Sequence, residues 1–155
     1  MVQVLVLYYS RTGNTEALAN AIADGSRQVK DVFVTIKRID YTTVQDFISC
    51  DAVAFGSPNY FGYMAGILKD FFDKAWSVRN NVVGKAAVAF TSGGGNSNSA
   101  LISIENMISS FKLEKVAEGV VSAGKPNEQD MKKCKDLGRK IAEAAIEKMK
   151  AVPKA

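Results

Sequence analysis

A short hydroxyl-rich segment, residues 10–15, carries the side chains of this chain that are best suited to binding a phosphate. It follows an apolar run that predicts a buried strand and precedes a pattern that predicts an amphipathic helix. A turn between a strand and a helix presents free backbone N–H groups, and the helix dipole adds positive potential there. The candidate phosphate ligands are Ser10, Arg11, Thr12, Gly13, Asn14 and Thr15.

The composition of this segment favours a terminal monophosphate. It has neither the lysine of a Walker loop nor the three glycines of a dinucleotide-binding turn. The simpler alternative is an ordinary turn in which Asn14 or Thr15 caps the helix. A single cap explains one polar residue, however, and not four hydroxyl or amide side chains within six positions.

Two further loops have compositions suited to a flat heterocycle. The first contains Pro58, Asn59, Tyr60, Phe61 and Gly62, and its aromatic rings could stack on a ligand ring or cover the core.

The second loop begins with Thr91, Ser92, Gly93 and Gly94. Its glycines would let the backbone approach a ligand closely. The alternatives are a surface loop ending in Ser97 or Ser99 as a helix cap, and a second phosphate site.

Strand and helix patterns alternate along the chain. The expected strands are Val2–Tyr9, Val32–Ile39, Asp51–Gly56, Lys85–Thr91 and a weaker one at Lys115–Ser122. The expected helices are Thr15–Val29, Thr43–Ile48, Tyr63–Trp76, Ser97–Phe111 and Asn127–Met149. This alternation predicts a single α/β domain over residues 1–155, with a doubly wound parallel sheet covered by helices on both faces. Ligands of such sheets bind beyond the carboxyl ends of the strands, where the three polar loops lie.

The composition excludes several classes of chemistry. The chain has 155 residues, 47% of them apolar, and no histidine, so Ser-His and Cys-His hydrolases are excluded. Cys50 and Cys134 lie far apart in the sequence, which predicts buried thiols and no metal site. No apolar run reaches the ~18 residues of a membrane helix and no signal peptide is evident, so we expect a cytoplasmic protein with no membrane partner.

The net charge of +4 comes from the C-terminal part of the chain. Residues 1–124 contain 11 basic and 11 acidic side chains, whereas residues 125–155 contain 9 basic and 5 acidic ones. A basic C-terminal helix could meet an acidic partner or nucleic acid. A solvated helix face with mixed charges is the interpretation we favour, without a nucleic-acid partner.

The three loops resemble those of the flavodoxin family. Residues 10–15 resemble its FMN-phosphate signature, and residues 56–62, followed by Met64 and residues 68–71, resemble one branch of the family. That branch includes the tryptophan-repressor-binding-protein type of NAD(P)H:quinone oxidoreductases. The resemblance implies a five-stranded parallel sheet in the order 2-1-3-4-5 that binds FMN noncovalently.

The resemblance also assigns expected roles to the loop residues. The phosphate would be held by Ser10, Thr12, Asn14 and Thr15, together with the backbone of Arg11 and Gly13. The isoalloxazine ring would be lined by Pro58, Asn59, Tyr60, Phe61 and Gly62. Its pyrimidine side and the ribityl chain would be lined by Thr91, Ser92, Gly93 and Gly94.

We therefore expect an FMN-binding electron-transfer flavoprotein with no catalytic side chain, acting as a monomer or small homo-oligomer with a redox partner protein. The alternative is an NAD(P)H-dependent quinone or FMN reductase, in which the glycine loop leaves room for a hydride donor or a quinone. A third hypothesis is a regulatory receiver module that binds no flavin. It would need acidic residues at the ends of the first and third strands, where this chain has Tyr9, Ser10, Gly56 and Ser57.

Overall fold

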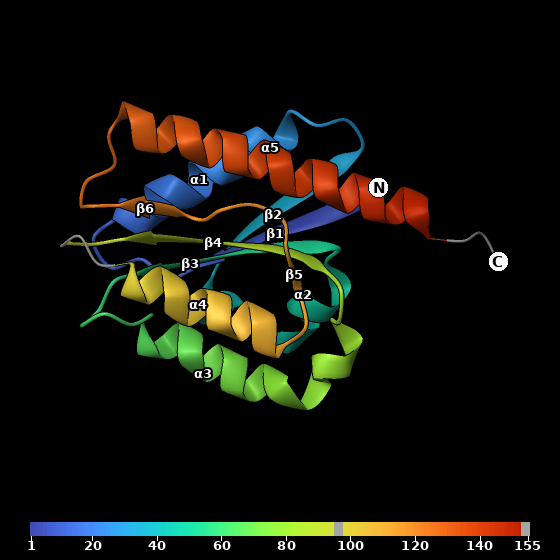
Figure 1. Ribbon diagram of the computed structural model, residues 1–155, viewed down its shortest axis with the longest axis horizontal. Helices are drawn as coiled ribbons and strands as arrows, with labels where there is room; N and C mark the ends of the chain where they lie inside the picture. Colours follow the sequence, from blue (N-terminus) through green and yellow to red (C-terminus); the bar gives the residue numbers. More distant parts are fainter. Residues whose placement is uncertain (95–97, 153–155) are drawn as a thin grey trace.

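The computed structural model describes residues 1–94 and 98–152, which form a parallel sheet between two layers of helices (Figure 1). The strands are β1 (Val2–Tyr8), β2 (Val32–Arg38), β3 (Ala52–Pro58), β4 (Ala86–Ser92), β5 (Glu114–Lys115) and β6 (Val120–Ser122). The helices are α1 (Asn14–Arg27), η1 (Ile39–Tyr41), α2 (Val44–Ser49), α3 (Gly66–Ala75), η2 (Trp76–Asn81), α4 (Ser99–Ser110) and α5 (Glu128–Ala151). The strand order is β2-β1-β3-β4-β5, with β6 also paired to β4, so the predicted order is confirmed.

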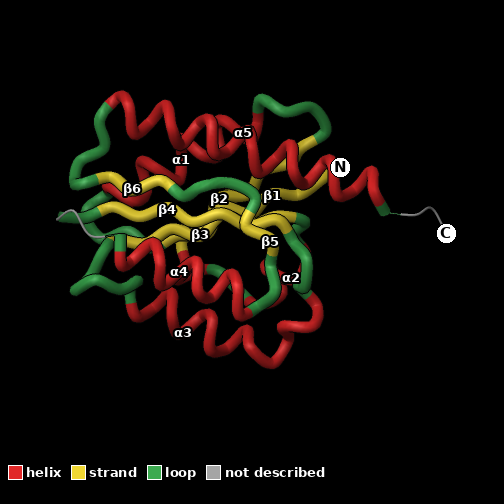
Figure 2. The backbone as a smooth tube through the Cα atoms, in the orientation of Figure 1, coloured by secondary structure: helices red, strands yellow, loops and turns green. Residues whose placement is uncertain are grey.

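Helices cover both faces of the sheet (Figure 2), and each face has its own apolar core. Because successive side chains of a strand point to opposite faces, Val4 and Val6 pack with α1 and α5, whereas Leu5 and Leu7 pack with α2, α3 and α4. Every residue of β3 and β4 is buried, as expected for central strands covered on both sides. The carboxyl ends of these strands are thereby fixed at one edge of the sheet.

Helices α1 and α5 lie in direct contact along one face of the sheet (Figure 1). A Cβ atom added at Gly138 of α5 would lie 1.9 Å from the carbonyl oxygen of Ile22 in α1, so only glycine permits this approach. The Ser26 hydroxyl donates a hydrogen bond of 2.8 Å to the Gly138 carbonyl across the same contact. The contact fixes α1, whose N-terminus forms part of the candidate site.

The fifth strand differs from the single strand predicted over Lys115–Ser122. Lys115 pairs with Ala87, and Val120 pairs with Phe90. Between these two pairs the chain advances five residues in this segment but only three residues in β4. The two additional residues do not fit the ladder, and residues 116–119 leave it. The strand is therefore divided into β5 and β6.

Helix α3 also begins later than the predicted Tyr63. The backbone of Tyr63 pairs with that of Tyr60, and the N–H groups of Met64 and Ala65 donate to the hydroxyls of Ser103 and Ser57 at 3.1 and 2.8 Å. These contacts hold the segment extended until Gly66.

The structure also accounts for the start of α5 and confirms the predicted burial of the two cysteines. Asn127 caps α5 in a reciprocal capping box with Asp130. Both cysteines are buried, and this burial raises the pKa of Cys50 and of Cys134 to about 12. No helix among the described residues has the length and apolar composition needed to cross a membrane.

Candidate functional site

The three polar loops meet at the carboxyl edge of the sheet, where they follow β1, β3 and β4. The hydroxyls of Thr15 and Ser92 lie 2.7 Å apart and join the first loop to the third. The Asn59 N–H donates to the Ser92 carbonyl at 2.6 Å and joins the second loop to the third. Ser92 is therefore the residue through which all three loops are connected.

The first loop has the geometry of an anion cradle. Gly13 is the N-cap residue of α1, with a φ of 98° and no side-chain cap, so neither Asn14 nor Thr15 caps this helix. The Gly13 N–H donates to Ser10 Oγ at 3.1 Å and closes the loop. Within residues 1–94 and 98–152, no acceptor is found for the N–H groups of residues 11, 12, 14, 15 and 16. These donors lie at the positive end of the helix dipole, where an anion is stabilised.

The side chains predicted to bind the phosphate lie in different environments. Arg11 and Thr12 are exposed, and Asn14 is half-buried. Ser10 and Thr15 are buried, the latter in contact with Ser92. Thr12 and Asn14 can thus reach a ligand from solvent, whereas Thr15 also holds the loop in place.

The second loop is a tight two-residue turn. Tyr60 and Tyr63 exchange backbone hydrogen bonds of 2.9 and 3.1 Å, and the two residues between them have positive φ, 56° at Phe61 and 79° at Gly62. Positive φ at both positions defines a type I′ turn, which is costly for a bulky residue such as Phe61. Asn59 Oδ1 supports the turn by accepting the Gly62 N–H at 2.8 Å. The Phe61 ring projects fully into solvent, whereas Pro58 is buried at the end of β3.

The third loop begins inside the sheet. Thr91 and Ser92 are buried residues of β4, and Thr91 pairs with Ser57. The Gly93 N–H donates to the Ser122 carbonyl at 3.1 Å, and Gly94 is exposed. The neighbouring Gly95, and the candidate cap Ser97, lie outside the described residues. Asn98 is the N-cap residue of α4, in place of the other candidate cap, Ser99.

Three residues beside the cradle were not predicted from the sequence. The Tyr8 hydroxyl donates to Glu16 at 2.8 Å, and burial together with this hydrogen bond raises the pKa of Tyr8 to about 12. Arg38 donates from Nη1 to the Ser10 carbonyl at 2.9 Å. The predicted order of the sheet could have indicated Arg38, because it places the end of the second strand beside the end of the first.

Comparison with known proteins identifies the family. A family model described as Flavodoxin matches residues 6–138. The chain belongs to the flavodoxin family. A curated flavodoxin from Aquifex aeolicus (strain VF5) is 34% identical to it over 160 residues, which cover 92% of this chain and 86% of the relative.

Solved structures agree with this assignment. A flavodoxin from the domain Archaea superposes with a TM-score of 0.82 at 28% identity, covering 94% of this chain and 99% of the other. A WrbA-like flavodoxin from Agrobacterium tumefaciens gives a TM-score of 0.84 at 19% identity, covering 95% and 99% of the two chains, and it supports the fold alone.

Flavodoxins are FMN-binding electron-transfer proteins, and membership of the family makes this chain one as well. The cradle fits the phosphate of that cofactor, because its unused N–H donors are gathered at the start of a 14-residue helix.

Proposed function

We propose that the chain carries electrons on FMN held by the three joined loops, with the phosphate in residues 10–15. The unused N–H groups at the start of α1 are the observation that carries this assignment. They and the side chains of Thr12 and Asn14 would donate to the phosphate oxygens, while Ser10 would keep the loop closed through Gly13. Because these donors are neutral, the helix dipole supplies the favourable potential for the phosphate.

The ring of the cofactor would lie against the second and third loops, between residues 58–62 and residues 91–94. Bound FMN supplies the electron-transfer chemistry, and the protein orients it and tunes its electronics. The turn between Tyr60 and Tyr63 would offer backbone groups to the polar rim of the ring. Gly62 can reorient its peptide at little steric cost, whereas the other turn residue, Phe61, is already strained.

Apoprotein titrated with FMN and with riboflavin tests the phosphate assignment. Asn14→Asp places a negative charge in the cradle and should weaken FMN binding at least about tenfold, with a much smaller effect on riboflavin. Asn20→Asp, the same substitution at an exposed position further along α1, is the matched control. An apoprotein that binds no FMN, or variants with equal FMN affinity, would contradict the assignment.

We further propose that the redox partner is a protein with an acidic contact surface. The segments at the carboxyl edge, residues 9–15, 57–66, 91–99 and 122–127, contain Arg11 and Lys125 and no acidic residue. The end of β2 and the turn after it add Arg38 and Asp40, whose opposite charges lie 3.7 Å apart and offset each other. The nearest acids that follow the other segments in sequence are Glu16, which is hydrogen-bonded to Tyr8, and Glu128 in the first turn of α5. Positive potential around the cofactor would attract an acidic partner and raise its association rate.

Small oxidants of opposite charge test the sign of this potential. Photoreduced holoprotein is mixed with ferricyanide or with hexaammineruthenium(III) over a range of ionic strength. The rate with the anion should fall with added salt, and the rate with the cation should rise. The double variant Arg11→Gln with Lys125→Gln should weaken the dependence of both rates on ionic strength. Lys150→Gln, near the far end of α5, should leave that dependence unchanged. A rate with the anion that rises with added salt, and a rate with the cation that falls, would overturn the proposal.

We expect the partner protein, and not a nicotinamide, to supply the electrons. Holoprotein mixed anaerobically with NADH or NADPH should keep its oxidised absorption spectrum on the timescale of seconds. Rapid bleaching would favour the reductase alternative.

A further inference from the structure

Arg38 contacts the phosphate cradle, although it is not one of the residues assigned to bind the phosphate. Its Nη1 donates to the Ser10 carbonyl at 2.9 Å, a contact between the end of β2 and the loop after β1. Its guanidinium carbon lies 5.9 Å from the centre of the Tyr8 ring and 5.6 Å from that of Tyr9, so it is within cation–π distance of both rings.

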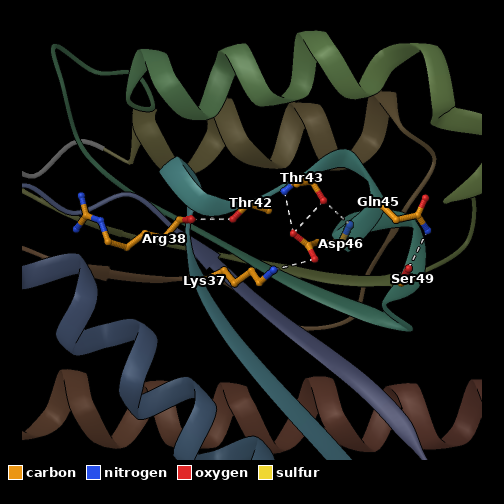
Figure 3. Close-up of polar contacts among 7 residues, drawn as sticks. All are labelled: Lys37, Arg38, Thr42, Thr43, Gln45, Asp46 and Ser49. Carbon is orange, nitrogen blue, oxygen red and sulfur yellow. Dashed lines mark hydrogen bonds and ion pairs between the residues drawn. The ribbon is translucent and has the colours of Figure 1, made fainter.

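The backbone of Arg38 is fixed as well. The Thr42 hydroxyl donates to the Arg38 carbonyl at 2.8 Å, and the 3₁₀ turn η1 begins at the next residue. Figure 3 shows that the neighbouring Lys37 extends to Asp46, whereas the Arg38 guanidinium points away from that carboxylate. Asp40 is the acidic partner of Arg38, at 3.7 Å, a distance too long for a strong hydrogen bond. The shorter contact of the guanidinium is therefore the one to the cradle.

We infer that Arg38 is a positioning residue for the FMN phosphate and acts through the Ser10–Arg11 peptide. In a trans peptide the C=O and the following N–H point in opposite directions. Because Arg38 holds the Ser10 carbonyl on one side, the Arg11 N–H points to the opposite side, where it would face a phosphate bound in the loop that Gly13 closes. The guanidinium also adds positive charge behind a cradle whose other donors are mostly neutral.

This inference rests on the proposed FMN site, and the test compares two ligands that differ only in the phosphate. Arg38→Gln should weaken FMN binding on the order of tenfold to a hundredfold and leave riboflavin affinity within about twofold. Arg38→Lys retains the charge and one donor, so part of the lost FMN affinity should return. Arg27→Gln, an exposed arginine at the other end of α1, should alter neither affinity.

The outcomes separate this inference from the function on which it rests. A wild-type apoprotein that binds no FMN would overturn both. A wild type that binds FMN, with an Arg38→Gln variant that binds FMN equally well, would overturn the role of Arg38 alone. Equal losses of FMN and riboflavin affinity would also overturn it, because a general disturbance of the fold does not distinguish the two ligands.

Discussion

The hydroxyl groups of Thr15 and Ser92 lie 2.7 Å apart, and both side chains are buried. They join the start of α1 to the end of β4 across 77 residues of sequence. Since Ser92 also accepts the Asn59 N–H through its carbonyl, the relative placement of the cofactor loops depends on this pair.

Removing one of these hydroxyls should destabilise the protein. Thr15→Val keeps the shape of the side chain but leaves the Ser92 hydroxyl buried without its partner, at a cost of about 1–3 kcal/mol in the free energy of unfolding. The double variant Thr15→Val with Ser92→Ala should lose less than the sum of the single changes. Urea unfolding of the four apoproteins measures this coupling, and strictly additive losses would show that the two hydroxyls do not interact.

Relieving the backbone strain at Phe61 should stabilise the apoprotein. Phe61 has a φ of 56°, a conformation that asparagine adopts more readily than other side chains. Phe61→Asn should therefore raise the free energy of unfolding by about 1 kcal/mol. Phe61→Ala removes the same exposed ring without relieving the strain, so an alanine variant as stable as the asparagine variant would contradict this explanation. A slower electron transfer in the more stable variant would indicate that the strained ring serves function.

The carboxylate of Asp46 should make stability dependent on acid pH. Burial alone would raise its pKa, but hydrogen bonds from the Thr43 N–H, from Lys37 and from the Thr43 hydroxyl lower it below its usual value (Figure 3). A group whose pKa is lowered by folding stabilises the protein above its unfolded pKa of ~3.9, and this stabilisation is lost as pH falls through the folded pKa.

Asp46→Asn should therefore cost about 0.5–1 kcal/mol at pH 7, a modest value because the carboxylate is partly exposed. The difference from wild type should shrink as the pH falls below about 4. Urea unfolding across this range checks the trend, with Asp73→Asn, which removes a more exposed partner of Lys69, as control. A difference that does not depend on pH would exclude the charge as its cause.

The contact between α1 and α5 should not tolerate a methyl group. Gly138→Ala would place a Cβ 1.9 Å from the Ile22 carbonyl oxygen, and the helices would have to move apart. We expect a loss of about 1–3 kcal/mol in thermal or urea unfolding. Gly66→Ala in α3, where the new Cβ meets nothing within 4 Å, should be neutral or stabilising. Equal effects of the two changes would show that the helix contact adapts freely.

The features that were predicted from sequence depend on local patterns. Alternation of apolar strands and helices was sufficient for the parallel sheet and the position of the loops, and the resemblance of the three loops to the flavodoxin family implied the order of the strands. The pair formed by Arg38 and Ser10 joins residues 28 apart, and no periodicity in the sequence indicates which side chains will meet at such distances.

Two local details were missed for a different reason. The late start of α3 results from serine hydroxyls in β3 and α4 that accept N–H groups of residues 64 and 65. The division of the fifth strand results from its register against β4. In both places the partner strand or helix decides the backbone conformation, and local propensity does not.

The division of the fifth strand into β5 and β6 leaves only short strands at one outer edge of the sheet. A long, regular edge strand offers unpaired N–H and C=O groups to any other extended chain and so favours aggregation. Here the outer edge consists of two residues in β5 and three in β6, separated by a segment that leaves the ladder. An incoming strand would find no run at this edge long enough to add to, so the interruption protects the β5–β6 side of the sheet, opposite β2, against edge-to-edge association.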